Sequence, residues 1–267
     1  MEFTLHRNHS EHWTMDTPHL HDRCELLLSL TDGGSFFLMD SLHPLRRGTL
    51  ILMGDQTLHR SVAVQGAYDR YVLHIPWETL VQASTARTDL RGIFSENRCV
   101  QLEEADTRKL SSALERCLSS SDEYGEDLLR ECAFLQVLVS VGQLLAQPAL
   151  YAVQPEGLSA PVRQAIDYIG AHLPEELPLD RLAERCFVTK YHLCHLFKAE
   201  TGFTVGEYIQ RLRVSRAAAL LREGESVQLA GERVGFASCG NFIRVFTRLM
   251  GTSPGRYGKL QKQSQIL

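Results

Sequence analysis

TKYHLCHLFKAETGFTVGEY (residues 189–208) and SCGNFIRVFTRLMGTSPGRY (residues 238–257) align at a constant offset of 49. The alignment pairs Leu193, Leu196 and Phe197 with Phe242, Val245 and Phe246, Gly202 with Gly251, and Tyr208 with Tyr257. In both copies the apolar residues recur at helical spacing. Upstream, LAERC (182–186) matches AGERV (230–234) at an offset of 48, so the second copy has a turn that is one residue longer. The sequence therefore predicts one structural unit that occurs twice.

Each copy has the plan of a helix-turn-helix. A first helix is expected at about 179–186 and again at 227–234, followed by a short turn. The hydroxyl residues Thr189 and Ser238 are suited to N-cap the second helix of each copy. Gly202 and Gly251 lie where a left-handed C-cap is favoured. The pattern predicts helix-turn-helix motifs at about 179–199 and 227–249.

The second helix of each copy has an outward face opposite its apolar one. At 3.6 residues per turn, Tyr191, His195 and Lys198 lie opposite Leu193. In the other copy the outward residues are Gly240, Arg244 and Thr247, flanked by Ile243 and Arg248. Such a helix fits a major groove, where its N-terminal residues reach base edges. The small first turn at 238–241 lets backbone amides approach a phosphate. The alternative is a solvated face with loose packing.

The segment between the copies, GEYIQRLRVSRAAALLREGE (206–225), predicts one long helix. About 17 residues at 1.5 Å each span roughly 25 Å. With the widths of the flanking units, the two reading helices are expected about 34 Å apart, which is one turn of DNA. Phosphate contacts are expected from Lys198, Arg211, Arg216 and Arg248, and they make affinity fall with salt.

Charge is unevenly distributed along the 267 residues. Residues 159–267 hold 15 Lys+Arg and 10 Asp+Glu, a net charge of +5, whereas the whole chain has −4, which leaves −9 for residues 1–158. A basic C-terminal part favours a polyanion partner. The seven scattered cysteines form no C-x-x-C pair and indicate reduced thiols. Because the sequence shows no signal peptide and no run of about 18 apolar residues, we expect a cytoplasmic protein without membrane contact.

The first 147 residues divide into a strand-rich and a helical part. Short apolar runs between Gly/Asp turns, at 25–31, 35–40, 49–53 and 68–75, predict an antiparallel barrel or sandwich over 1–76. Residues 77–147 are expected to be helical, and residues 148–158 form a proline-containing linker. The helix around 131–145 has two apolar stripes and needs two partners. The stripes are Leu128, Cys132, Leu135 and Val139, and Phe134, Leu138, Val141 and Leu145. One partner is the β domain; the other is a second subunit or another helix of this chain.

Several segments resemble AraC/XylS-type transcription regulators. HLFKAETGFTVGEYIQRLRVSRAAALL (195–221), ERVGF (232–236), NFIRVF (241–246) and GTSPGRY (251–257) resemble their DNA-binding domain. PHLHDRCEL (18–26) and GTLILMGDQTLHR (48–60) are similar, more loosely, to their cupin-type effector arm. The resemblance implies an α+β protein with three parts: a cupin-like antiparallel β-barrel with helical dimerisation segment in 1–147, a linker in 148–158, and an all-α DNA-binding domain of seven helices in 159–267.

The resemblance also implies function. It implies a regulator of promoter DNA that responds to a small-molecule effector. From the chain itself we expect a homodimer through the helix around 131–145 and an effector such as a sugar; an activator would also contact RNA polymerase. Neither enzymatic activity nor a cofactor is expected. The base contacts of the family map to Tyr191, Cys194, His195, Lys198, Cys239, Gly240, Asn241 and Arg244. Because Gly240 has no side chain, readout by the second helix should depend on Asn241 and Arg244. A helical glycine costs about 1 kcal/mol, so Gly231 predicts a less stable or more adaptable second copy.

Histidines are concentrated in the N-terminal part. His19, His21 and Glu25 have the same parity and would share one face of a strand, and His59 lies in the later segment. The spacing H-x-H-x3-E with a later His is similar to the cupin metal motif, although Gly54 and Gln56 depart from it. These side chains line an effector pocket, are structural, or hold a divalent metal; we expect the first and no metal. The rival functions are a metal-dependent cupin enzyme fused to a DNA-binding domain and a regulator that responds to metal or to thiol chemistry at Cys194 or Cys239.

Overall fold

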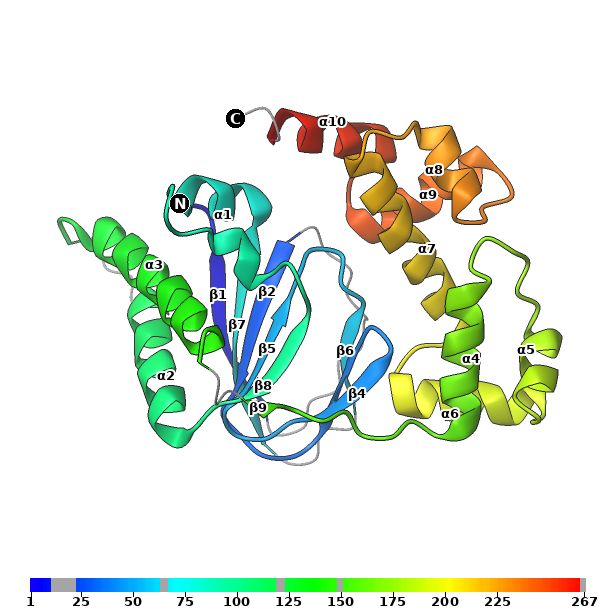
Figure 1. The fold of residues 1–267 in the computed structure, drawn as a ribbon, viewed down its shortest axis with the longest axis horizontal. Helices are drawn as coiled ribbons and strands as arrows, with labels where there is room; N and C mark the ends of the chain where they lie inside the picture. The colour runs from blue at the N-terminus through cyan, green and yellow to red at the C-terminus, as the bar shows by residue number, and fades with distance from the viewer. Residues whose placement is uncertain (11–22, 63–66, 119–122, 148–150, 265–267) are drawn as a thin grey trace.

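The computed structural model describes residues 1–10, 23–62, 67–118, 123–147 and 151–264 (Figure 1). Two antiparallel sheets and helices α1–α3 form the N-terminal region, residues 1–147, with β9 (Tyr151–Ala152) added to the larger sheet from the following segment, and helices α4–α10 form the C-terminal region, residues 159–264. In Figure 1, α2 and α3 lie on one side of the sheets and α4–α6 on the opposite side. The predicted α+β class with an all-α C-terminal part is confirmed.

The described strands are β1 (Thr4–Ser10), β2 (Arg23–Ser29), β3 (Ser35–Leu38), β4 (Ser41–Pro44), β5 (Thr49–Met53), β6 (His59–Val62), β7 (Tyr68–Pro76), β8 (Arg98–Gln101) and β9 (Tyr151–Ala152). The helices are α1 (Trp77–Ala83), η1 (Leu90–Ile93), α2 (Glu104–Leu118), α3 (Glu126–Leu145), α4 (Ala160–Ala171), α5 (Leu179–Arg185), α6 (Lys190–Thr201), α7 (Val205–Arg222), α8 (Val227–Arg233), α9 (Cys239–Met250) and α10 (Pro254–Ser264). The four strands and the long connecting helix expected from the sequence are all present.

The strands form two separate sheets. The larger has the order β1-β7-β2-β5-β8-β9 and the smaller has the order β4-β3-β6. Among the described residues no ladder joins the two sheets, so the strands do not form the predicted barrel but the alternative, a sandwich. A barrel needs strands that continue from one sheet into the next, whereas here each edge strand of the smaller sheet has only four residues.

Strands β1, β4, β6, β8 and β9 were not expected from the sequence. β4 and β6 read SLHP and HRSV, which have no apolar alternation, and both pair with β3. β8 lies within the stretch expected to be helical and pairs with β5. Part of the expected linker also pairs, because β9 joins β8 and Glu156 bridges to Leu42. These pairings depend on partner strands that are distant in the sequence. The periodicity of apolar residues within one strand therefore does not predict them.

Alternating residues of the larger sheet face two different cores. On β2, Leu26 and Leu28 pack in a cluster with α1, η1, α2 and α3, whereas Leu27 faces the smaller sheet. On β5, Leu50 and Leu52 face the helices, and Ile51 faces the smaller sheet. Both faces of these strands are therefore buried. This explains why their sequences are continuous apolar runs without alternation.

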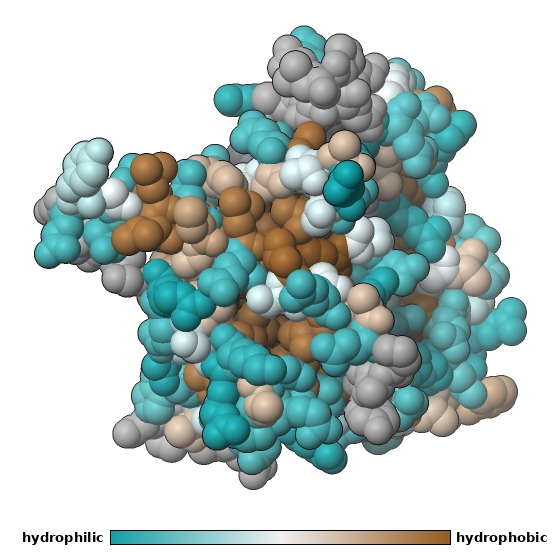
Figure 2. Space-filling model, turned by 60° about the vertical axis from the view of Figure 1, so that its left-hand side comes forward, coloured by the Kyte–Doolittle hydropathy of each residue, from teal (hydrophilic) through white to brown (hydrophobic). Residues whose placement is uncertain are grey.

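Helix α3 buries one of its two apolar stripes. Phe134, Leu138 and Val141 are fully buried against the larger sheet, as predicted for one partner. On the other stripe Leu128 and Val139 are exposed, with 63% and 43% of their surface accessible. Figure 2 shows apolar side chains gathered on the side of the molecule that carries α2 and α3. Leu135 of this stripe is partly buried against the same core, whereas Leu128, Cys132 and Val139 have no covering helix in the described chain.

Helix α3 is more apolar than was expected of any segment from the sequence. By length and composition it is apolar enough to cross a membrane, with a mean hydropathy of 1.5 over 18 residues. The sequence was expected to contain no such run. Core helices of soluble proteins meet the same criterion, and the buried stripe of α3 packs on a sheet as a core helix does.

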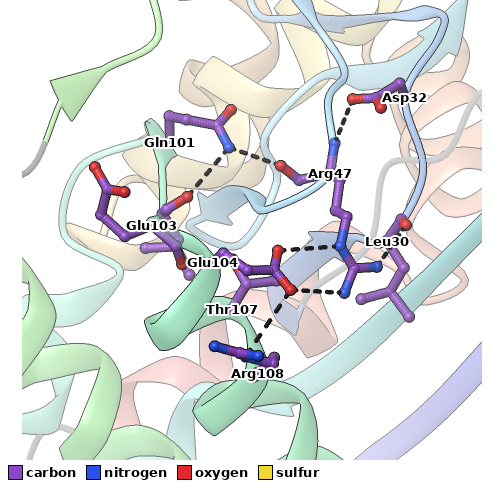
Figure 3. A network of polar contacts seen from close by, with 9 residues as sticks. Leu30, Asp32, Arg47, Gln101, Glu103, Glu104, Thr107 and Arg108 are labelled. Atoms are coloured by element: carbon purple, nitrogen blue, oxygen red, sulfur yellow. Dashed lines mark hydrogen bonds and ion pairs between the residues drawn. The ribbon is translucent and has the colours of Figure 1, made fainter.

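Arg47 fastens the start of α2 to the edge of the larger sheet (Figure 3). Its guanidinium forms an ion pair with Glu104 at 3.2 Å and donates to the carbonyl of Leu30 at 3.0 Å. Its backbone carbonyl accepts from the side chain of Gln101 at 2.7 Å, and its backbone N–H donates to Asp32. Because the pair with Glu104 is largely exposed, the backbone contacts matter more for position than the charges do.

The duplicated unit has the predicted local structure in both copies. The side chain of Thr189 accepts from the backbone N–H of His192, and that of Ser238 accepts from Asn241, each at 3.3 Å. Helices α6 and α9 both end in left-handed C-caps, at Gly202 and Gly251, with φ of 76° and 69°. The turn between α8 and α9 is one residue longer than that between α5 and α6.

The smaller sheet lies between two hydrophobic cores, that of the sandwich and that of helices α4–α7. On β3, Phe36 faces the larger sheet, and Phe37 is buried among residues of α4–α7. The Phe37 ring meets those of Phe203 and Tyr208 edge-on at 5.9 and 6.2 Å. On β6, His59 faces the larger sheet, whereas Arg60 donates to the carbonyl of Gly202 at the end of α6. Strand alternation thus connects the interior of the sandwich with the helical region.

Candidate nucleic-acid interface and effector site

Helices α6 and α9 present the predicted outward faces. Leu193 and Phe197 on α6 and Phe242 and Phe246 on α9 are fully buried. The opposite faces are exposed: Tyr191, His195 and Lys198 on α6, and Cys239, Gly240, Asn241 and Arg244 on α9. Cys194 is half-buried at the flank of α6. Each predicted base-contacting side chain therefore lies at a solvent-facing or flanking position.

Asn241 and Arg244 form a pair on α9. The Arg244 guanidinium donates to the Asn241 Oδ1 at 3.0 Å, one helical turn away. Gly240 directly precedes this pair, and beyond its own helix no atom of the described residues lies within 4 Å of a Cβ built on it. The N-terminal turn of α9 is thus open, and Asn241 in this turn holds the side chain of Arg244 in the next turn. This arrangement fits base readout by Arg244.

The three arginines predicted to contact phosphate differ in exposure. Arg216 and Arg248 are exposed, and Arg248 donates to Gln210 at 3.0 Å. Arg211 is half-buried, with its guanidinium 5.9 Å from the centre of the Phe203 ring. Burial lowers the pKa of Arg211, the carboxylate of Glu207 opposes that effect, and the nearby Arg248 and Arg60 add to it. Positive charge thus accumulates between α6, α7 and α9.

The glycine in α8 has a packing role. A Cβ built on Gly231 would lie 2.8 Å from the Phe242 ring, closer than real contacts allow. The equivalent pair in the first copy is Ala183 and Leu193, both buried. In the second copy the smaller residue on α8, glycine in place of alanine, is thus matched by a larger residue on α9, phenylalanine in place of leucine. The Phe242 ring thus fills the space beside Gly231.

Glu25 lies at the centre of a buried polar group in the sandwich. Its Oε2 is 3.3 Å from His59 Nε2 and 3.2 Å from His74 Nε2. Glu25 and His74 are register partners on β2 and β7, and His59 reaches them from the opposite sheet. The predicted Glu25 and His59 are thus brought together. His19 and His21, also predicted there, lie outside the described residues.

The polar contacts of His59 favour its charged form. Its Nδ1 lies 2.8 Å from the carbonyl of Thr57, and a carbonyl only accepts, so Nδ1 carries a hydrogen. Its Nε2 faces a carboxylate and needs a hydrogen too. Burial disfavours the imidazolium, but the charge and hydrogen bond of Glu25 outweigh it and raise the pKa of His59 above its ordinary value. The Phe36 ring stacks on the imidazole, with centres 5.8 Å apart.

Further polar side chains share this interior. Arg70, 4% exposed, lies over the ring of Tyr68 at 4.3 Å, and burial lowers its pKa. Tyr68, Arg70 and His74 alternate along β7 and share its inner face. Sequence reasoning missed His74 and Arg70, although the period of two in YDRYVLHI contains that signal. Charged groups in an apolar sandwich are costly unless they are paired.

The side chains of this interior offer both donors and acceptors of hydrogen bonds. Carboxylate, imidazole, guanidinium and phenol groups together can donate and accept hydrogen bonds around a polar molecule. Over the ranges that the structure describes, no group of three or more His, Cys, Asp and Glu side chains could hold a metal ion. With His19 and His21 outside those ranges, the full metal motif is untested.

The two sites define a class: a DNA-binding regulator with an N-terminal ligand-binding part. Residues 1–138 match the family model of the AraC-like ligand binding domain, and residues 182–259 match that of a helix-turn-helix domain. The chain belongs to the AraC family of transcription regulators. It combines a ligand-binding domain with a DNA-binding helix-turn-helix domain.

Individual relatives cover the chain to different extents. YfiF of Bacillus subtilis, an HTH-type transcriptional regulator, is 24% identical over 257 residues, which is 93% of this chain and 80% of YfiF. The multiple antibiotic resistance protein MarA of Escherichia coli is 30% identical over 105 residues, 39% of this chain and 83% of MarA. The crystal structure of ToxT from Vibrio cholerae aligns with 97% of this chain and 98% of its own at 14% identity and a TM-score of 0.41.

Proposed function

We propose that the protein binds promoter DNA with α6 and α9 in successive major grooves, under control of a small molecule bound between the two sheets. The observation that carries the proposal is the duplicated unit, whose two second helices have buried apolar faces and exposed polar ones. Helix α7 joins the units with 18 residues, about 27 Å at 1.5 Å per residue. That length suits two reading helices one DNA turn apart.

Base contacts are assigned to the exposed residues of the reading helices, with Arg244 as the main reader on α9. Lys198, Arg211, Arg216 and Arg248 are assigned to phosphates. The effector is assigned to the interior around Glu25, His59 and His74, for which a polar molecule such as a sugar is the best chemical match. We propose that the protein acts by binding, not by catalysis, and in the cytoplasm, where promoter DNA lies. The domains proposed are 1–147 and 159–267.

Selection of bound duplexes from random sequence tests the proposal. The full chain is expected to enrich a motif with two half-sites about 10 base pairs apart. With four assigned cations, the logarithm of affinity should fall with the logarithm of salt with a slope of roughly −4, at about −0.9 per phosphate. Addition of candidate metabolites should alter the enrichment. A library that emerges unenriched at low salt would refute DNA reading.

The exposed stripe of α3 is proposed as the contact with a second copy of the chain. Leu128, Cys132 and Val139 are exposed on one side of the helix, and apolar side chains gather on this side of the molecule (Figure 2). A two-fold dimer would bring the same stripe of both subunits together. The stripe would then have the second partner that its pattern requires.

Substitution of Val139 by Asp tests this dimer. The like charges of the two subunits would face each other across the axis, so association should weaken by at least about tenfold. Sedimentation velocity over a concentration series measures the change. Gln82→Asp, an exposed position on α1, is the matched control and should leave association unaltered. A wild-type protein that sediments as a monomer throughout the series would exclude the dimer.

A further inference from the structure

The N-terminal region contacts both copies of the duplicated unit at the same repeat position. The hydroxyl of Tyr208 donates to the carbonyl of Met39 at 3.2 Å. The side-chain amide of Gln56 donates to the hydroxyl of Tyr257. Tyr208 and Tyr257 are equivalent in the repeat, and each has 2% of its surface exposed. Two turns of the N-terminal region thus reach two matching points, one in each unit.

Each of these tyrosines rests on its reading helix. The Tyr208 ring meets that of Phe197 on α6 edge-on, with centres 5.4 Å apart. The Tyr257 ring meets that of Phe246 on α9 in the same way at 5.6 Å. Phe197 and Phe246 are themselves equivalent in the repeat. At these two points one aromatic ring lies between the N-terminal region and the reading helix, and Arg60 in addition contacts the end of α6 directly at Gly202.

The two turns are coupled to each other and are strained. Met39 and Gln56 have φ of 58° and 60°, values that residues other than glycine adopt at a cost. The Met39 N–H donates to the carbonyl of Leu58 at 2.7 Å, so the first turn is tied to the end of the second. The strain is held in place by these contacts. A movement of one turn would be passed to the other.

Further contacts extend along α7. Ser215 donates to the carbonyl of Gln56 at 3.0 Å, and Arg222 forms an ion pair with Asp55 at 2.5 Å. The contacts therefore follow one side of α7 from Tyr208, next to the first unit, to Arg222, next to the second. Throughout, the outward residues of α6 and α9 remain exposed. The docked arrangement thus leaves the reading faces open to DNA.

We propose that the N-terminal region fixes the separation and relative angle of the two reading helices by holding Tyr208 and Tyr257 together. The inference rests on the proposed reading of DNA by α6 and α9. It assigns these tyrosines as positioning residues that do not touch DNA. Gln56, which contacts Tyr257, lies in the turn directly before β6, and β6 carries His59 on its inner face. A ligand that contacts His59 therefore shifts this turn and, through Tyr257, the second reading helix. In this way the ligand changes which spacing of half-sites the protein accepts.

Removal of the hydroxyls tests the proposal in the full chain. Tyr208→Phe, Tyr257→Phe and the double variant keep the rings on Phe197 and Phe246. Tyr168→Phe is the control, since the Tyr168 hydroxyl is buried without a hydrogen-bond partner among the described residues. The probes are the duplex selected by the wild-type protein, the same duplex with one or two base pairs inserted between the half-sites, and each half-site alone.

The measured quantity is the loss of affinity when the spacing between the half-sites is changed. One inserted base pair should weaken wild-type binding by at least about tenfold but the double variant by about threefold or less, since each hydroxyl is worth about twofold to tenfold. Affinity for single half-sites should stay the same in all variants. A purely structural role would lower every affinity alike. If the double variant retains the wild-type spacing dependence, the proposal is overturned.

Gln56→Ala provides a second route to the same test. It removes the Tyr257 contact from the N-terminal side and leaves the helical region unaltered, so it is informative even if the tyrosine variants fold poorly. It should reproduce the relaxed spacing of Tyr257→Phe, and a wild-type dependence would count against the inference. A wild-type protein that selects no duplex would instead refute the proposed function itself.

Discussion

Arg244→Ala should remove sequence preference at one position of the second half-site while binding to DNA persists. A bidentate contact between arginine and guanine discriminates by about 1–3 kcal/mol, which is roughly tenfold to 100-fold. The guanidinium is exposed and is oriented by Asn241 through a 3.0 Å hydrogen bond. Little side-chain ordering therefore remains to be done when DNA binds. Selection from a randomised site library, repeated with the variant, measures the loss position by position.

Arg216→Ala is the matched comparison. Arg216 is an exposed arginine of the same region, assigned to a phosphate on α7. Its loss should weaken binding to all sequences alike and reduce the salt slope by about 1. An Arg244→Ala protein that selects the wild-type motif without change would show that Arg244 does not read a base. Asn241→Ala should give a partial and non-additive loss, because the two side chains act as a pair.

Gly231→Ala should destabilise the second unit even though alanine is the better helix former. Alanine at a helical position gains about 1 kcal/mol over glycine. Here its Cβ would lie 2.8 and 2.9 Å from ring atoms of Phe242, which is fixed between Phe236 and Phe246. Overpacking of this kind costs about 1–3 kcal/mol. We expect a net loss of about 1 kcal/mol in the free energy of unfolding, measured by denaturant titration.

The residue pair of the first copy suggests a second substitution that should restore the stability lost in Gly231→Ala. There the equivalent positions hold Ala183 and Leu193, so the double variant Gly231→Ala/Phe242→Leu rebuilds a pair that the protein already uses. Phe242→Leu alone leaves a cavity next to Gly231 and should also destabilise. The double variant should be more stable than the sum of the single changes predicts, by about 1 kcal/mol or more. Strict additivity would show that the two positions do not compensate each other.

The effector site could be predicted only in part. Glu25 and His59 were found because their spacing is similar to a known motif. His74 was missed, although it lies opposite Glu25 in the ladder between β2 and β7. The partner of a buried charge depends on strand register, and register is set by the assembled sheet. The barrel was predicted wrongly for the same reason. Closure depends on the pairing of edge strands, and short, polar edge strands such as β4 and β6 have no sequence pattern that predicts their pairing.

The sequence by itself determined what depends on neighbours along the chain. Helical spacing, the hydroxyl caps at Thr189 and Ser238, and the glycine C-caps are local, so the duplicated unit and its outward faces could be derived from residues alone. Tertiary structure decided everything that joins distant segments: the two separate sheets, the Glu25–His59–His74 group, and the contacts of Met39 and Gln56 with Tyr208 and Tyr257, 169 and 201 residues away. No periodicity carries such information, because these contacts form only when both surfaces are already built.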